Sequence, residues 1–535
     1  MEQYLQTTYN KRQGIWSGVK LSPMYDFDCS VGRIIHKALG TYPTNVAQIC
    51  LIDGKTTTNA EILAWSVRLA QHFKQRCLRH DDVICIAAKT STYITPTAVA
   101  CLFNATPFHA VNPTLELTTL THVLAITKPK LIFCDAAQYE KLKTASAAWS
   151  PEFITILGKV EGVAHVEDLL TATKTEMFYQ PVPLCLGGNQ TMAILCSSGT
   201  SGQPKAVCRP NHQLIINSNF IGSDMVIYCN SGLDWNSGLI AFLYSVTNGC
   251  TRIIPDKPFS ATYFVELVDK YKINFVMCGT RHVNELIASP EATRQRLASI
   301  MLLAIGGSWI AADSLRQLQQ LLSGQIFYAY GSTEFPLTSG GFYKEHLGNS
   351  VGQLLPGRSV RIVDDNGKSL GCGEVGELLV HYIHSWSGYY GNALETQRTQ
   401  DAQGWFHSGD LGYFDADHNL YIVDRKKEIY KCLGMQYSPN ELESLIAELP
   451  AVQEVCVVGI YDERLGDAPA ALIVKCPGSF LSEQLVKQHV EKRCSVAYKQ
   501  LHGGVYFATQ LPLNANGKVL RRAVKLQLQQ SLPDR

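Results

Sequence analysis

The chain has 535 residues, 46% of them hydrophobic, and its 47 basic side chains nearly balance 46 acidic ones. This is enough apolar material for a large core, and more than one domain normally fits in such a length. A net charge of +1 argues against a polyanion binder that works by bulk electrostatics, so we expect no nucleic-acid partner. No apolar run is long enough for a membrane-spanning helix, and the polar N-terminal segment lacks the apolar core of a signal peptide.

Short apolar runs alternate with amphipathic stretches through most of the chain, which is typical of α/β proteins. The spacing predicts a helix over Thr58–Gln75, a strand at Asp82–Ala87, a helix over Thr95–Ala105 and a strand at Lys130–Asp135. The predicted strands lack polar alternation, which indicates a sheet covered on both faces.

The 17 cysteines are scattered singly, and no Cys-x-x-Cys pair occurs. This excludes the usual zinc and thioredoxin-like motifs. Several thiols lie inside apolar runs and are expected to behave as small buried hydrophobic residues, namely Cys85, Cys101, Cys134 and Cys196. Such usage favours a reducing, intracellular compartment.

From about Ser350 onward, closely spaced turns separate short β-branched runs, which predicts a β-rich subdomain. The polar segment Asp424–Glu428 then breaks two apolar runs, and a smaller unit follows it to the end. We therefore expect a large α/β domain of several subdomains over residues 1–424 and a small α+β domain over residues 425–535. Gly371–Gly376 spells Gly-x-Gly-x-x-Gly, but a strand-like run follows it where a dinucleotide fingerprint needs a helix, so NAD binding is not expected.

One hydroxyl- and glycine-rich segment follows the apolar run Met192–Cys196 directly. Its backbone N–H groups and hydroxyls can converge on phosphate oxygens, with a lysine to balance the charge. It is not a Walker A loop, because the spacing of that motif is absent. The candidate phosphate-binding residues are Ser197, Ser198, Gly199, Thr200, Ser201, Gly202 and Lys205.

Ser197–Val207 closely resembles the phosphate-binding signature of the acyl-adenylate-forming superfamily, with Ala206 where that family usually has glycine. The resemblance implies an ATP-dependent acid–coenzyme A ligase. Such an enzyme uses Mg2+, converts a carboxylic acid to its acyl-AMP with release of pyrophosphate, and passes the acyl group to the thiol. It also implies that the small C-terminal domain is mobile.

Further motifs resemble the family in the same order along the chain. In Tyr330-Gly331-Ser332-Thr333-Glu334, the resemblance implies that Glu334 holds Mg2+, Thr333 contacts the phosphates and Tyr330 stacks near the adenine. A lone carboxylate is sensible chemistry, because Mg2+ takes its other ligands from phosphates and water. Gly306 and Gly307 resemble the turn that lines the adenine and acyl pocket.

The last set of motifs concerns the ribose, the hinge and the second half-reaction. By resemblance, Asp410 accepts hydrogen bonds from both ribose hydroxyls, which suits a carboxylate's two oxygens. Arg425 joins it there, and the hinge lies within Asp424–Lys427. Lys431–Gln436 resembles the loop of the thioester-forming step, where Gly434 leaves room for pantetheine and Lys431 supplies a cation. Asn516-Gly517-Lys518 resembles the motif of the catalytic lysine.

The texture is similar to the 4-coumarate–CoA ligase-like branch that includes insect luciferase-like synthetases. Asp234–Gly238 and Asn217 depart from the luciferase pattern, and Trp235 is similar to the aromatic gate of fatty acyl-CoA synthetases. Gly279–His282 lacks the family's usual proline, so an altered wall of the acyl pocket is expected. We favour a fatty acid as substrate and leave open whether the acid is medium-chain, long-chain or aromatic. The alternatives are a luciferase-like monooxygenase and a catalytically weak nucleotide-binding or acyl-binding protein.

Localisation and assembly are less constrained. Relatives in this branch often end in a peroxisomal tripeptide, whereas Pro533-Asp534-Arg535 carries no such signal. The expectation is the cytosol, with the peroxisome kept open by family analogy. The oligomeric state is left open.

Overall fold

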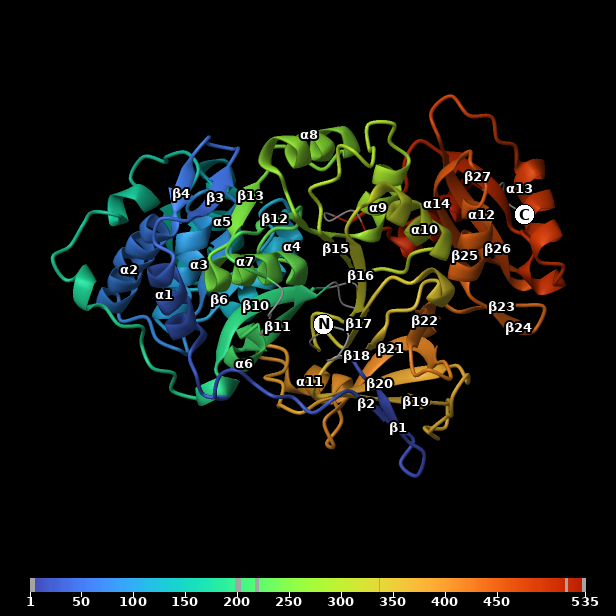
Figure 1. Ribbon diagram of the computed structural model, residues 1–535, viewed down its shortest axis with the longest axis horizontal. Coiled ribbons are helices and arrows are strands. Elements are labelled where there is room, and N and C mark those ends of the chain that lie inside the picture. Colours follow the sequence, from blue (N-terminus) through green and yellow to red (C-terminus); the bar gives the residue numbers. More distant parts are fainter. Residues whose placement is uncertain (1–4, 198–203, 217–220, 336, 515–517, 532–535) are drawn as a thin grey trace.

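The computed structural model describes residues 5–197, 204–216, 221–335, 337–514 and 518–531. Three sheets belong to the large N-terminal part of the chain, and a fourth belongs to the small C-terminal part at the right of Figure 1. The expected mixed α/β architecture, with a large and a small domain, is confirmed. Several candidate residues lie outside the described residues, namely Ser198, Gly199, Thr200, Ser201, Gly202, Asn217, Asn516, Gly517 and the C-terminal Pro533–Arg535.

The first sheet is parallel except for one hairpin at its edge, where β10 and β11 run antiparallel. Helices cover it, and its central strands are buried throughout, as the unbroken apolar runs predicted. In spatial order, the strands are β11 (Lys205–Pro210), β10 (Thr191–Ser197), β6 (Phe108–Ala110), β5 (Ile84–Ala87), β7 (Leu131–Cys134), β8 (Glu152–Thr155) and β9 (Ala164–His165).

The second sheet has a parallel centre with antiparallel strands at both edges. It lies beside the first sheet in the large domain (Figure 1). In spatial order, its strands are β18 (Gln353–Leu354), β17 (Ser339–Phe342), β16 (Gln325–Tyr330), β15 (Leu302–Ile305), β14 (Phe275–Cys278), β12 (Val226–Cys229), β13 (Thr251–Ile254), β3 (Val46–Cys50) and β4 (Thr56–Thr58).

The third sheet is the predicted β-rich subdomain, and all its pairs are antiparallel. It recruits two strands from the N-terminus, which the sequence did not indicate. Gly371–Gly376 leads into a strand rather than a helix, which supports the rejection of NAD binding. The strands are β1 (Thr8–Asn10), β2 (Ile15–Ser17), β19 (Arg358–Val363), β20 (Gly376–Tyr382), β21 (Trp405–Phe414) and β22 (Leu420–Arg425).

The C-terminal unit has its own sheet and its own apolar clusters, as a separate domain does. Its strands are β24 (Met435–Tyr437), β23 (Tyr430–Cys432), β26 (Gly466–Lys475) and β25 (Val452–Asp462), with β27 (Gly504–Ala508) parallel to β26. Its helices are α12 (Pro439–Ala447), α13 (Glu483–Arg493) and α14 (Arg521–Ser531).

Among the described helices of the large domain, those that begin at Asn59, Ala261 and Ala393 have a side-chain cap at their N-terminus. Thr58 and Glu61 form a reciprocal capping box at the start of the predicted helix that ends at Gln75. These helices are α1 (Val31–Thr41), α2 (Asn59–Gln75), α3 (Ile94–Phe103), α4 (Leu117–Thr127), α5 (Tyr139–Ala145), α6 (Asn211–Leu214), α7 (Asn236–Asn248), α8 (Ala261–Tyr271), α9 (Thr280–Ile287), α10 (Ala312–Leu321) and α11 (Ala393–Thr399).

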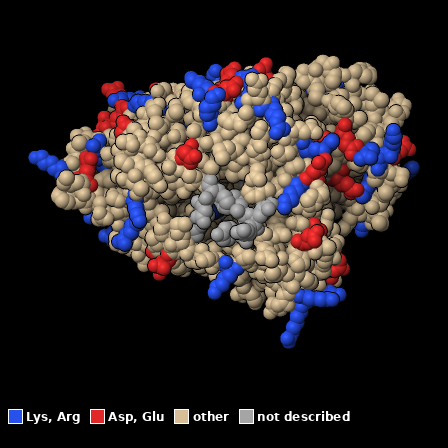
Figure 2. Space-filling view, viewed as in Figure 1, with Lys and Arg blue, Asp and Glu red and all other residues tan. Residues whose placement is uncertain are grey.

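The surface and the thiols match the composition. Basic and acidic side chains are interspersed on the face shown in Figure 2 rather than gathered by sign. All 17 cysteines are free thiols, and of the four named above Cys196 alone is only half-buried. Within the described residues, no helix is long and apolar enough to cross a membrane.

Candidate active site

Lys205 begins β11, immediately after the glycine-rich segment, and its charge is already matched. Its Nζ donates to Glu395 Oε1 at 2.5 Å and lies 5.0 Å from the centre of the Tyr389 ring. Ser197, at the end of β10, is buried, and its hydroxyl has no hydrogen-bond partner among the described residues. A buried hydroxyl without a partner costs free energy unless a ligand or water satisfies it. The β10–β11 junction therefore has both a fixed cation and an unused donor for an anionic ligand.

Glu334 lies just beyond β16 and is held from two sides. Tyr389 Oη donates to its Oε1 at 3.0 Å, and Ser332 Oγ donates to its Oε2 at 3.0 Å. Each oxygen keeps a further lone pair for a cation. Within the described ranges, no cluster of three His, Cys, Asp or Glu side chains could hold a metal by itself. A single carboxylate fits Mg2+ that takes its remaining ligands from phosphates and water.

Arg209 is a buried cation behind the same site. Its guanidinium donates to Asn236 Oδ1 at 3.0 Å and to the Thr333 carbonyl oxygen at 3.1 Å. Burial lowers its pKa to about 10, with the Glu334 carboxylate acting in the opposite direction. The side chain stays charged at neutral pH and contributes positive potential beside Glu334.

Asp410 on β21 is buried, and protein donors approach both of its oxygens. Tyr330 Oη donates to Oδ2 at 2.6 Å, and Arg425 Nε lies 3.1 Å from Oδ1. Burial raises the pKa of Asp410, while the charge of Arg425 opposes that shift. The sequence grouped these three residues at one nucleotide site, and the structure brings them together.

Lys518 reaches this cluster from the C-terminal domain. Desolvation by the surrounding protein is the main cause that lowers the pKa of Lys518. The charge of Arg425 lowers this pKa further, while the charges of Glu428 and Asp410 raise it. The backbone is fixed by a reciprocal pair, in which Lys518 N donates to Asn514 Oδ1 and Asn514 N donates to the Lys518 carbonyl, both at 2.9 Å. The predicted catalytic lysine therefore faces the predicted ribose site.

The Lys431–Gln436 segment is a β-hairpin that lies elsewhere. Lys431 pairs with Gln436 across it, and Leu433 and Gly434 turn with φ of 50° and 78°. Positive φ at both turn positions is the type I′ geometry of a two-residue hairpin. Both Lys431 and Gln436 are exposed, and Figure 1 shows β23 and β24 at the outer edge of the C-terminal domain, away from β10, β11 and β16. The structure does not bring this hairpin to the nucleotide site in the present arrangement.

Asp424, at the expected hinge, joins the two domains. Burial raises its pKa to about 6, although Ser438 Oγ donates to its Oδ2 at 2.6 Å. A second link is the ion pair between Arg281 of α9 and Glu454 of β25, at 2.9 Å. Lys427 is exposed in the short turn that follows β22.

The glycine turns after β15 and β16 bring backbone segments closer together than a side chain would allow. Gly307 adopts a φ of +88°, which disfavours any other residue. A Cβ on Gly306 would lie 3.3 Å from the Ala329 carbonyl oxygen, and a Cβ on Gly331 would lie 2.9 Å from the Leu337 Cα. These turns follow β15 and β16, at the carboxyl ends of neighbouring parallel strands, where α/β sheets bind ligands.

Trp235 is the N-terminal cap residue of α7, and the carboxylate of the preceding residue, Asp234, has a raised pKa. The Leu239 N–H donates to the Trp235 carbonyl oxygen at 2.8 Å, and the Trp235 side chain is half-buried. Burial raises the pKa of Asp234 to about 6.

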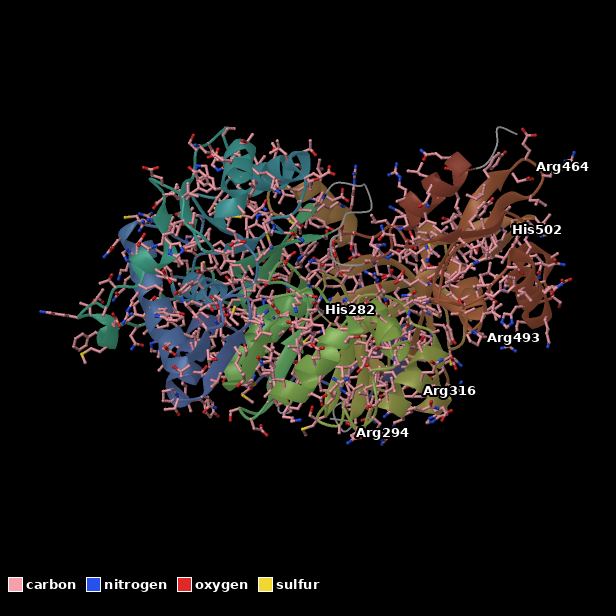
Figure 3. The ribbon with its side chains drawn as sticks, turned by 90° about the horizontal axis from the view of Figure 1, so that it is seen from above. His282, Arg294, Arg316, Arg464, Arg493 and His502 are labelled. Atoms are coloured by element: carbon pink, nitrogen blue, oxygen red, sulfur yellow. The ribbon has the colours of Figure 1, made fainter. Side chains whose placement is uncertain are left out.

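His282 of α9, labelled in Figure 3, lies against Phe259 with ring centroids 4.4 Å apart, and burial lowers the pKa of His282 to about 4. The imidazole is neutral, and its Nδ1 has no partner among the described residues.

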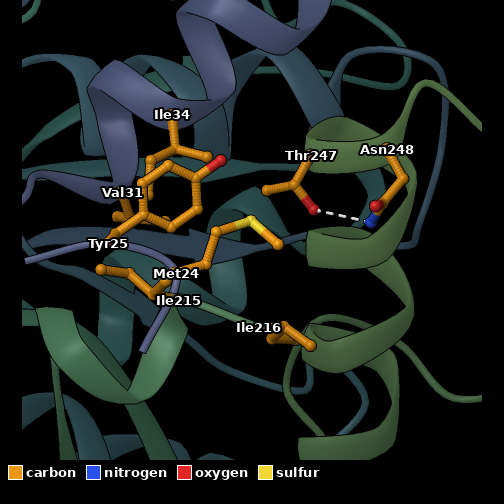
Figure 4. Close-up of a pocket in the computed structure, with 8 residues that line it drawn as sticks. All are labelled: Met24, Tyr25, Val31, Ile34, Ile215, Ile216, Thr247 and Asn248. Carbon is orange, nitrogen blue, oxygen red and sulfur yellow. Dashed lines mark hydrogen bonds between the residues drawn. The ribbon is translucent and has the colours of Figure 1, made fainter. Parts of the chain in front are cut away.

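A cavity of about 60 Å³ opens at the far end of α7 (Figure 4). Apolar side chains from α1 and from the segment after α6 form most of its wall, and Thr247 and Asn248 add polar atoms. Ile240 and Tyr244 form a half-buried stripe between it and the capped end of the helix. The lining residues are Met24, Tyr25, Val31, Ile34, Ile215, Ile216, Thr247 and Asn248.

Sequence reasoning missed Tyr389, Glu395 and Arg209. Tyr389 and Glu395 lie in the stretch between two recognised motifs, and their role depends on contacts with strands far away in the chain. Arg209 sits inside an apolar strand, where a lone charged residue was the available signal.

The fold is that of a protein with a large and a small α/β domain, whose candidate site residues lie between and beside them, and comparison with known proteins gives the family. The chain belongs to the AMP-binding enzyme family: residues 35–390 match that family, and residues 441–518 match the AMP-binding enzyme C-terminal domain. The expected place in the acyl-adenylate-forming superfamily is confirmed.

Individual relatives agree with this assignment. The chain is 28% identical over 513 residues to 4-coumarate–CoA ligase 3 of Oryza sativa subsp. japonica, and this alignment covers 91% of each chain. It superposes on the ATP-bound crystal structure of MatB from Rhodopseudomonas palustris with a TM-score of 0.83 and 22% identity, over 93% of this chain and 98% of that one. It superposes on the anthranilate CoA ligase AuaEII in complex with anthranoyl-AMP with a TM-score of 0.84 and 19% identity, over 95% and 99%.

Proposed function

We propose that the protein is an AMP-forming acid–coenzyme A ligase that uses ATP, Mg2+ and coenzyme A. The observation that carries the proposal is the convergence of Lys518 with Asp410, Arg425 and Tyr330, contributed by both domains. The curated relatives named as CoA ligases support the same reaction class.

The first half-reaction follows from the charges around the site. The substrate carboxylate attacks the α-phosphate of ATP, an acyl-AMP forms, and pyrophosphate leaves. Asp410 accepts hydrogen bonds from the ribose hydroxyls, and Lys518 stabilises the negative charge that develops on the α-phosphate. Lys205 and the donors after Ser197 hold the outer phosphates. Bound through Glu334, Mg2+ would neutralise phosphate charge and orient the leaving group.

The second half-reaction requires another arrangement of the domains. Coenzyme A thiolate attacks the acyl carbonyl, and AMP leaves. We assign the pivot to Asp424–Lys427, so that residues 1–424 stay fixed while residues 425–535 rotate. Rotation would withdraw Lys518 and bring in Lys431, Gly434 and Gln436. The hairpin lies away from the nucleotide site, and it could reach that site only through a domain motion of the kind that gates other enzymes.

For the substrate, we propose a fatty acid. Trp235 stands at one end of α7 and the cavity at Thr247 at the other, about 18 Å apart at the usual rise of a helix. The half-buried stripe between them supports a long, narrow acyl site better than a compact aromatic one.

A screen for acid-dependent pyrophosphate release tests the proposal. Purified protein, Mg-ATP and coenzyme A are incubated with saturated acids of graded length and with aromatic acids, and thioester is quantified. Thioester formation that rises with chain length supports the proposal. Release with aromatic acids alone would replace the fatty acid, light emission with oxygen would favour the luciferase-like monooxygenase, and no acid-dependent release would leave a nucleotide-binding protein without ligase activity.

A further inference from the structure

The Lys205–Glu395 ion pair joins two segments that the sequence does not connect. Lys205 and Glu395 side chains are 16% and 26% exposed, so solvent screens the pair only in part. Lys205 is the first cause of the lowered pKa of Glu395. Arg398 Nη1 lies 3.5 Å from the other carboxylate oxygen, but its side chain is 77% exposed and contributes little. Lys205 is therefore the main partner of Glu395.

Glu395 is held in place independently of Lys205. It lies in the first turn of α11, where its N–H donates to Asn392 Oδ1 at 3.1 Å. The preceding residues pair with β11: Cys208 N donates to Gly388 O at 3.0 Å, and Tyr390 N donates to Ala206 O at 2.8 Å. The backbone that carries the carboxylate thus keeps its position when Lys205 changes partner.

Tyr389 extends the link to the magnesium carboxylate. Its ring lies against Lys205, and its hydroxyl donates a hydrogen bond to Glu334. Its backbone N–H donates to Thr396 Oγ1 at 2.9 Å. The residue is buried, and an isolated bridge pairs it with Val207 of β11. One aromatic side chain thereby contacts both the cation, through its ring, and the carboxylate, through its hydroxyl.

We propose that Glu395 is an exchangeable counterion for Lys205 and thereby sets the affinity of the site for ATP and pyrophosphate. The inference rests on the proposed function, in which Lys205 meets the outer phosphates. With no nucleotide bound, Glu395 neutralises Lys205. Phosphates that arrive must displace the carboxylate or share the cation with it, and Glu395 recaptures Lys205 as pyrophosphate departs.

The sign of the effect follows from charge. Glu395 competes with the phosphates for one cation and repels them directly. Because a phosphate must first break an ion pair that solvent screens only in part, removal of the carboxylate corresponds to about four- to tenfold tighter binding of the phosphate to Lys205, while direct repulsion adds a smaller part. A residue that only positioned Lys205 would give the opposite sign, because its loss would leave the cation less well placed.

The experiment is direct measurement of Mg-ATP and Mg-pyrophosphate dissociation constants by calorimetry, with neither acid nor coenzyme A present. Glu395→Gln keeps the shape of the side chain and removes its charge. We expect about four- to tenfold lower dissociation constants and slower pyrophosphate release. In a Lys205→Gln background, Glu395→Gln should lose most of this effect, because direct repulsion alone remains. Glu152→Gln, which breaks the remote Arg76–Glu152 pair, is the matched control and should change nothing.

Each outcome decides the proposal. Unchanged or weaker binding by Glu395→Gln overturns it, and so does an equally large effect in the Lys205→Gln background. If wild-type protein binds Mg-ATP but no acid triggers pyrophosphate release, the ligase function fails while the counterion inference is still decided by the binding constants. If wild-type protein binds neither ligand, both fail.

Discussion

Replacement of Lys518 by alanine should separate the two half-reactions. The Lys518 backbone is fixed by Asn514 and its side chain makes no hydrogen bond or ion pair with the other described residues, so the variant should fold with a stability within about 0.5 kcal/mol of wild type. What it loses is the one described lysine that faces Asp410 and Arg425. Removal of a preorganised charge-stabilising group usually costs about 10²–10³ in rate, or roughly 3–4 kcal/mol.

The assay is single-turnover formation of acyl-AMP from the best acid, followed separately by thioester formation from pre-made acyl-AMP. We expect the large loss in the first step and a much smaller change in the second. Lys492→Ala, an exposed lysine on α13, serves as the matched control and should leave both steps unchanged. Equal losses in both steps would refute the role assigned to Lys518.

Three further predictions test the hinge, the hairpin and the acyl site. A Cβ on Gly434 meets no atom within 4 Å in this arrangement, so Gly434→Leu should spare acyl-AMP formation and slow thioester formation at least tenfold. Gly478→Leu is the control, because Gly478 has a similar φ and equal space for a Cβ. Equal impairment of both steps by Gly434→Leu would contradict the domain rotation. The folded pKa of Asp424 is raised to about 6, so its contribution to stability is largest below the ordinary value near 4 and is lost as pH rises through 6. Asp424→Asn should therefore gain up to about 3 kcal/mol on wild type between pH 4 and 7 in chemical unfolding, and parallel pH profiles would exclude this. Thr247→Phe fills the cavity at the end of α7 and should lower kcat/KM for long acids about tenfold while sparing short ones; a uniform loss would remove the cavity from the acyl site.

Local signals were enough to predict much of the fold. The buried runs at Ile84–Ala87 and Leu131–Cys134 are strands because unbroken apolar sequence suits a sheet covered on both faces. The helix that ends at Gln75 was visible from its periodicity, and its start carries a capping box. The two N-terminal strands of the third sheet were not visible, because β2 joins the sheet through β19, which lies more than 300 residues away.

The candidate site divides in the same way. Asp410, Arg425 and Tyr330 could be named because each sits in a contiguous motif, and the structure then brings them into contact. Tyr389 and Glu395 act through side chains that meet only when separate sheets pack together. The outward position of the Lys431–Gln436 hairpin is a property of domain orientation, which no local pattern encodes.

The central claim is that a carboxylate attacks the α-phosphate of ATP, and isotope transfer tests it most directly. The protein is incubated with Mg-ATP, coenzyme A and a fatty acid labelled with oxygen-18 in both carboxylate positions, and the products are analysed by mass spectrometry. The account predicts one labelled oxygen in AMP and none in pyrophosphate, because the bridging oxygen of the acyl-AMP stays with phosphorus when the thiol attacks the carbonyl carbon. Label in inorganic phosphate together with ADP, or AMP without label, would contradict the acyl-adenylate mechanism.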